Sequence, residues 1–141
     1  MRIVFDTNVY ISAALNQGLS YEIFEKLAEP KSDYFLFISS DIWHELTGKL
    51  QELGRKKIIS ESVASKFMMN VSEAAKFTEP KEKLRVVKSD PDDDKILECA
   101  VSAQADLIVT MDRDLLRLKR FRNIGIVHPK TFSFMFPEKI K

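Results

Sequence analysis

The sequence predicts an α/β protein, a three-layer sandwich in which a mainly parallel central sheet of four or five strands carries helices on both faces. Its strand-like segments are short, continuous apolar runs, which are typical of strands buried on both faces. These runs alternate with segments of helical periodicity, as right-handed crossovers between parallel strands require. With 141 residues, 45% of them hydrophobic, the chain is expected to form a single domain over residues 1–141.

The first half of the chain predicts two strands and four helices. Serine at the start of a helical pattern indicates an N-cap, and glycine near its end indicates a stop. In order, the expected elements are a strand at 2–5, a helix at 9–15 stopped by 16–18, a helix capped by Ser20, a strand at 34–38, a helix capped within 39–41 and closed by Gly54, and a helix begun by Ser60. In the last of these helices, Val63, Phe67 and Val71 share the face expected to point inward.

The second half continues the alternation after a loop at 77–83. The expected elements are a strand at 84–87, an acid-rich helix beginning near Pro91, a strand at 106–110, a helix from Leu115 and a strand at 124–127. Pro129 then opens a phenylalanine-rich segment. We expect this segment to dock on the core as a helix, and a contact surface for another protein is the alternative.

The start of the acid-rich helix is the most informative stretch of the sequence. Four of the five residues at 90–94 are aspartates, and acidic residues suit the positive end of a helix dipole. At about 100° per residue, Asp93 falls in the middle of the apolar arc that follows, and Asp94 falls on its flank. A carboxylate aimed at a core must be protonated, paired with a cation or bound to a metal.

Three other carboxylates are expected at the same edge of the sheet. Asp6 directly follows the first strand, Asp112 follows the strand at 106–110, and Glu45 lies early in the helix after the second strand. Ligands of open α/β sheets bind at this edge, beyond the carboxyl ends of the strands. The alternative is that Asp6 and Asp112 are only helix caps and that Glu45 is solvated.

Carboxylates packed together cannot all ionise without a counter-charge. Mg²⁺ or Mn²⁺, which prefer oxygen ligands, would supply it, and with only two histidines and one cysteine a zinc site is not expected. The chemistry that fits is phosphoryl transfer, in which the metal activates a water and stabilises the leaving oxygen.

Net charge and the length of the apolar runs limit the expected binding partners and location of the protein. A net charge of +1 gives no overall field to attract nucleic acid or a membrane surface, so such binding must come from local patches. No apolar run is long enough to span a bilayer and no signal peptide is recognised, so we expect a cytoplasmic protein without a membrane partner.

Four blocks of the sequence resemble the PIN-domain family of ribonucleases. They are residues 4–8, Glu45, residues 90–100 and residues 105–116, and their order and spacing agree over almost the whole chain. Among these proteins the chain is most similar to the small bacterial or archaeal toxin components of toxin–antitoxin pairs.

The resemblance implies a divalent-metal-dependent endoribonuclease that hydrolyses phosphodiester bonds of single-stranded RNA. It also implies a cognate antitoxin protein as a partner and allows a homodimer. Carried over by position, the catalytic and Mg²⁺- or Mn²⁺-binding acids are Asp6, Glu45, one of Asp93 and Asp94, and Asp112, with Asn8 and Thr110 as polar supports. Counting back from Thr110 without a gap favours Asp94, whereas the inward arc favours Asp93, so both stay open.

RNA is expected to lie along basic residues beside the acids, with Arg113, Arg117 and Arg120 as candidates. The alternative is an ordinary solvated surface.

Other readings of the same architecture fit less well. A receiver-type phosphoacceptor domain needs an acidic pair after the first strand, and a haloacid-dehalogenase-type phosphatase needs an aspartate where Asn8 stands. The remaining alternative is a catalytically idle PIN-like module that binds RNA or protein.

Overall fold

A computed structural model describes residues 1–87 and 90–136 of the chain. Its centre is a six-stranded sheet in the order β3-β2-β1-β4-β6-β5. The strands are β1 (Arg2–Phe5), β2 (Phe35–Ile38), β3 (Ala75–Phe77), β4 (Leu107–Val109), β5 (Arg120–Phe121) and β6 (Ile124–Val127). All neighbouring strands are parallel except β5 and β6, so the predicted α/β class with a mainly parallel sheet is confirmed.

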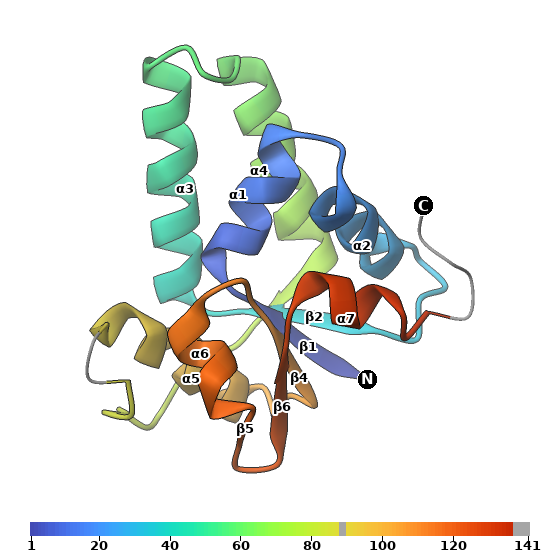
Figure 1. The fold of residues 1–141 in the computed structure, drawn as a ribbon. Coiled ribbons are helices and arrows are strands. Elements are labelled where there is room, and N and C mark those ends of the chain that lie inside the picture. The colour runs from blue at the N-terminus through green and yellow to red at the C-terminus, as the bar shows by residue number, and fades with distance from the viewer. Residues whose placement is uncertain (88–89, 137–141) are drawn as a thin grey trace.

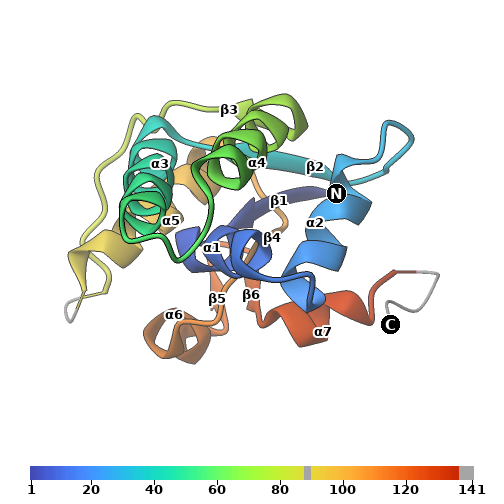
Figure 2. The ribbon, with the colours of Figure 1, turned by 90° about the horizontal axis from the view of Figure 1, so that it is seen from above.

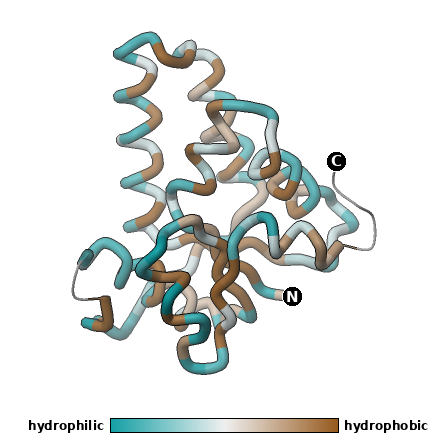
Figure 3. Tube along the Cα trace, in the orientation of Figure 1, coloured by the Kyte–Doolittle hydropathy of each residue, from teal (hydrophilic) through white to brown (hydrophobic). Residues whose placement is uncertain are grey.

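Helices cover both faces of this sheet. They are α1 (Thr7–Leu15), α2 (Leu19–Ala28), α3 (Ser40–Arg55), α4 (Glu61–Ala74), α5 (Pro91–Ser102), α6 (Arg113–Leu118) and α7 (Pro129–Ser133). Helices α1, α2 and α4 lie over one face and α5 lies under the other, while the α3–α4 hairpin projects from the body (Figures 1 and 2). Hydrophobic residues concentrate in the central strands (Figure 3), as expected for strands covered on both sides.

The predicted strand at 84–87 is wrong. The third strand is instead β3, which pairs with β2 through Leu36↔Ala75 and Ile38↔Phe77. The 84–87 segment lies against α5, where Leu84 N–H donates to Glu98 Oε2 at 2.9 Å. Its backbone donors are therefore satisfied by side chains of a helix and not by a strand ladder. The two-residue strand β5 was also not predicted, because it is too short to show a periodic pattern.

Two of the predicted helix caps are confirmed and one is wrong. Ser39 accepts from Ile42 N–H and Ser60 accepts from Val63 N–H, as N-caps do. Helix α2, however, begins after Gly18, and Ser20 is buried inside its first turn. In α4 the inward residue of the first turn is Ala64, which is 3% exposed, and Val63 faces outward.

The phenylalanine-rich segment docks on the core as expected. Phe132 of α7 is fully buried, and its ring meets that of Tyr34 edge-on at 5.8 Å between centroids. Phe136 packs on both rings, whereas Phe134 remains 74% exposed. Within the part of the chain that the structure describes, no helix combines the length and apolar character needed to cross a membrane.

Truncation of Phe132 tests this docking. We expect Phe132→Ala to lower the free energy of unfolding by about 3–5 kcal/mol, because it removes a fully buried ring. The matched control is Phe134→Ala, which should change it by less than about 0.5 kcal/mol. Equal losses in the two variants, measured by urea unfolding, would contradict the described packing.

Candidate metal centre

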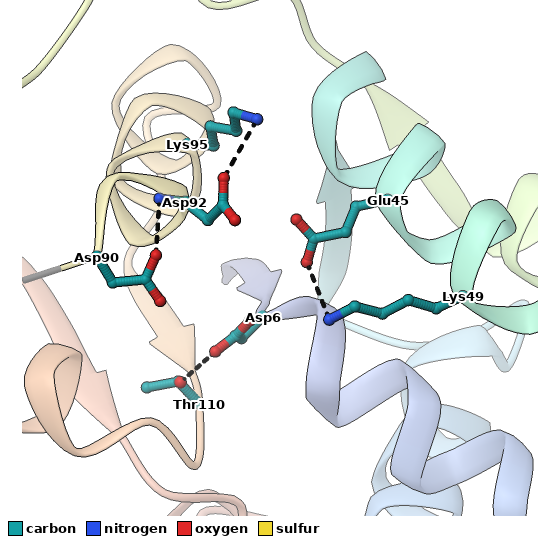
Figure 4. A network of polar contacts seen from close by, with 7 residues as sticks. All are labelled: Asp6, Glu45, Lys49, Asp90, Asp92, Lys95 and Thr110. Atoms are coloured by element: carbon teal, nitrogen blue, oxygen red, sulfur yellow. Dashed lines mark hydrogen bonds and ion pairs between the residues drawn. The ribbon is translucent and has the colours of Figure 1, made fainter.

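The site begins where β1 and β4 end side by side. Phe5 pairs with Val109, so Asp6 and Thr110 emerge next to each other at the carboxyl edge of the sheet. Asp6 is 6% exposed and accepts a 2.6 Å hydrogen bond from the Thr110 hydroxyl (Figure 4). The same hydroxyl oxygen accepts from the backbone N–H of Asp112 at 3.0 Å. Thr110 therefore links Asp6 to Asp112 through these two hydrogen bonds.

Three aspartates gather around this edge. One carboxylate oxygen each of Asp90, Asp93 and Asp112 lies within 4.8 Å of the other two, and we call these residues the three-aspartate cluster. Asp90 is the N-cap of α5, accepting from Asp92 N–H at 3.0 Å. Asp112 is the N-cap of α6, accepting from Asp114 N–H at 2.8 Å. Two helix N-termini thus meet at the cluster, with their positive dipole ends beside the acids.

Asp93 is the buried member of the cluster. It is 5% exposed, and its Oδ2 finds no hydrogen-bond partner among residues 1–87 and 90–136. Burial raises the pKa of Asp93 to about 8, and the negative charges of Asp112 and Asp90 and a hydrogen bond with Asp112 add to the shift. A buried carboxylate oxygen without a partner is costly, so this position fits a bound cation.

Asp6 experiences the same crowding. Burial raises its pKa, the Thr110 hydrogen bond and the nearby backbone N–H of Asn8 lower it, and the charges of Asp112 and Glu45 raise it further. The side chain of Asn8, predicted as a second polar support, is exposed. Asn8 acts on Asp6 through its backbone N–H, which lowers the pKa of Asp6.

The donor set suits a hard divalent ion. Two ligands of one Mg²⁺ ion, each at about 2.1 Å, lie no more than about 4.2 Å apart. Oxygens already within 4.8 Å of one another need only a small side-chain adjustment to share such an ion. Carboxylate oxygens alone favour Mg²⁺ or Mn²⁺ over softer metals, so the residues present fit the expected cofactor.

Asp94, the alternative to Asp93, has another partner. It is 7% exposed, and its Oδ1 accepts from the backbone N–H groups of Val86 and Val87, at 2.9 Å each. This carboxylate therefore ties the 84–87 segment to α5. The geometry favours Asp93 as the ligand.

Glu45 comes from α3, across the site from α5. Figure 4 shows its carboxylate directed toward the space beside Asp6, with Lys49 next to it. Lys49 Nζ lies 3.4 Å from Glu45 Oε1. Glu45 therefore reaches the site and acts on Asp6 electrostatically, but it is not part of the three-aspartate cluster.

The three arginines predicted to contact RNA lie in different surroundings in the structure. Arg113 is exposed at the start of α6, directly after Asp112. Arg117 pairs with Asp114 at 3.2 Å. Arg120 of β5 pairs with Gly125 of β6. Gly125 in turn pairs with Leu107, the first residue of β4. Arg120 therefore lies toward the opposite edge of the sheet from Asp6.

The sequence reasoning missed Asp90 as a site residue. Asp90 lies three residues before Asp93, and residues three apart lie on the same side of a helix. That spacing was the available signal.

A mainly parallel sheet with acids gathered at its carboxyl edge defines a candidate metal-dependent hydrolase of the α/β class. The chain belongs to the PIN-domain family, whose family model matches residues 2–114, and PIN domains are nucleases that generally use a divalent metal. The expected resemblance is thereby confirmed.

One sequence relative and two solved structures are similar to this chain. An uncharacterized protein of Methanocaldococcus jannaschii, MJ1680, is 30% identical over 135 residues, covering 92% of this chain and 84% of its own. VapBC2 from Rickettsia felis, solved bound to a DNA fragment from their promoter, matches with a TM-score of 0.63 and 19% identity over 91% of this chain and 98% of its own. PAE2754 from Pyrobaculum aerophilum matches with a TM-score of 0.63 and 19% identity over 93% of this chain and 85% of its own.

The charge of Asp93 should make the stability of the metal-free protein depend on pH. Its pKa is 3.8 for a free aspartate side chain and about 8 in the fold, so the folded state holds a proton that the unfolded chain releases. The resulting stability is complete below the lower value and is lost as pH rises through the upper one.

We therefore expect wild-type protein with chelator to lose thermal stability between these two pH values, and Asp93→Asn to flatten the loss. Near neutral pH the variant should be more stable by about 1–3 kcal/mol, because asparagine is neutral without taking up the proton that folded Asp93 must bind. Asp92→Asn, at an exposed position of the same helical turn, is the control and should keep the wild-type profile. Identical profiles for wild type and Asp93→Asn would refute the assignment.

Asp94 should act on stability in the opposite direction. Asp94→Ala leaves the Val86 and Val87 amides without their acceptor, and we expect a loss of about 2–4 kcal/mol in the free energy of unfolding. Chemical denaturation at constant pH measures it. A loss below that of Asp92→Ala would show that the 84–87 segment is held by other contacts.

Proposed function

We propose that this protein is an endoribonuclease that uses Mg²⁺ or Mn²⁺ to hydrolyse phosphodiester bonds of single-stranded RNA. The observation that carries the proposal is the buried Asp93 oxygen, which has no partner within the described part of the chain and belongs to the same cluster as Asp90 and Asp112. Membership of a nuclease family supports the same reaction class.

Each acid has a separate part in this proposal. Asp93 and Asp112 would hold the ion, and Asp6, kept in place by Thr110, would complete the binding side formed by β1 and β4. A bound divalent ion lowers the pKa of a coordinated water and stabilises charge on the phosphate. In this proposal Glu45, which comes from α3, would accept the proton of the attacking water.

RNA binding would come from local cations, since the net charge is only +1. Arg113 is the first candidate, because it is exposed and adjacent to Asp112. Lys49, which lies next to Glu45, is a candidate on the α3 side. Contacts from such residues to phosphates would give affinity without sequence preference.

The proposal extends to biological context through the resemblance to toxin components of toxin–antitoxin pairs. We propose that the protein acts as the toxin of such a pair in the cytoplasm, that an antitoxin protein covers the acidic edge, and that the active form is a homodimer. The fold shared with VapBC2 from Rickettsia felis supports this extension.

The second candidate is an idle PIN-like module that binds RNA or protein without cleaving it. The ion pair between Lys49 and Glu45, at 3.4 Å, favours it in part, since it leaves the Glu45 carboxylate less available to a metal or a water. The two candidates differ in whether the protein cleaves RNA.

Cleavage of labelled single-stranded RNA separates them. With Mg²⁺ or Mn²⁺ we expect cleavage that chelator abolishes and that Asp6→Asn lowers by roughly 100-fold or more, because metal-ion catalysis supplies several kcal/mol. Asp92→Asn should cleave as wild type does, and duplex RNA and single-stranded DNA test the substrate class. Absence of metal-dependent cleavage across varied RNA sequences would leave the idle module.

A further inference from the structure

Asp90 has more charge than its capping role needs. As N-cap of α5 it accepts from Asp92 N–H through Oδ1. Asparagine and serine cap helices about as well without a charge. A negative charge at this position interacts unfavourably with Asp93 and Asp112, because one oxygen of each acid lies within 4.8 Å of the others.

The buried member of the cluster supplies independent evidence for a ligand. Asp93 is 5% exposed, and its Oδ2 is buried with no partner among the described residues. An oxygen in that state, flanked by two more carboxylates, is positioned to bind a cation that touches all three.

The other side of the site is less well placed to complete this ion's ligands. Glu45 has Lys49 Nζ at 3.4 Å, so its charge is already partly compensated. Asp94 is engaged with two backbone amides. Asp6 remains near the site as well, but among the described residues Asp90 is the acid that forms a group with Asp93 and Asp112 within 4.8 Å.

We propose that Asp90 is a direct ligand of the divalent ion, in addition to the acids that the resemblance to PIN domains implies. The inference rests on the proposed function in that it takes the acidic edge to be a metal site. One side chain would then cap α5 through Oδ1 and bind the ion through its carboxylate. The ion would also compensate the repulsion that an acidic cap creates here.

Mn²⁺ titration of the full chain tests the proposal, with affinity measured by calorimetry and by the loss of the free-ion signal in electron paramagnetic resonance. We expect Asp90→Asn to weaken Mn²⁺ binding roughly 10-fold or more, because affinity follows the number of charged ligands. Asn keeps the cap, so the melting temperature in chelator should not fall. Asp90→Ser, which also keeps the cap and removes the charge, should behave in the same way.

Asp92→Asn is the matched control, since Asp92 is exposed, lies in the same helical turn and pairs with Lys95 at 3.4 Å. It should bind Mn²⁺ as wild type does. Wild-type affinity in both Asp90 variants, with binding lost in Asp93→Asn, would overturn the role of Asp90 and leave the proposed function standing. Absence of Mn²⁺ binding by the wild-type protein would instead overturn the metal site itself, and with it both proposals.

Discussion

Repulsion among carboxylates at one edge of the sheet is the constraint on which the rest of this structure depends. Asp6, Asp93 and Asp112 come from three separate parts of the chain, and the parallel pairing of β1 with β4 brings two of them together. The Thr110 hydroxyl stands between Asp6 and Asp112, donating to one and accepting from the backbone of the other. The apolar sheet beneath them supplies the folding free energy that makes such crowding tolerable.

The aspartates that create the charge also build the local structure. Asp90 and Asp112 begin α5 and α6 as N-caps, and the positive ends of those helices face the acids. Asp94 uses the same chemistry for a different purpose, accepting two amides from a segment that has no strand partner. Neighbouring residues of one type thus serve as cap, candidate ligand and loop anchor, and the direction of each side chain separates these roles.

The fold class and the position of the acids could be predicted from the sequence because both follow from local pattern. Apolar runs predict buried strands, and the helical wheel places Asp93 inward, as observed. The 84–87 segment was misread because its apolar residues pack on α5, and no local pattern shows whether a backbone amide meets a strand or a side chain. Arg120 lies far from the acids because β5 pairs antiparallel with β6, and only the tertiary structure specifies this pairing.

The two edge strands of the sheet are short. β5 at one margin has two residues and β3 at the other has three, so neither offers a row of free amides and carbonyls long enough to template a strand from a neighbouring molecule. Edge strands this short guard the protein against the edge-to-edge polymerisation that threatens open sheets.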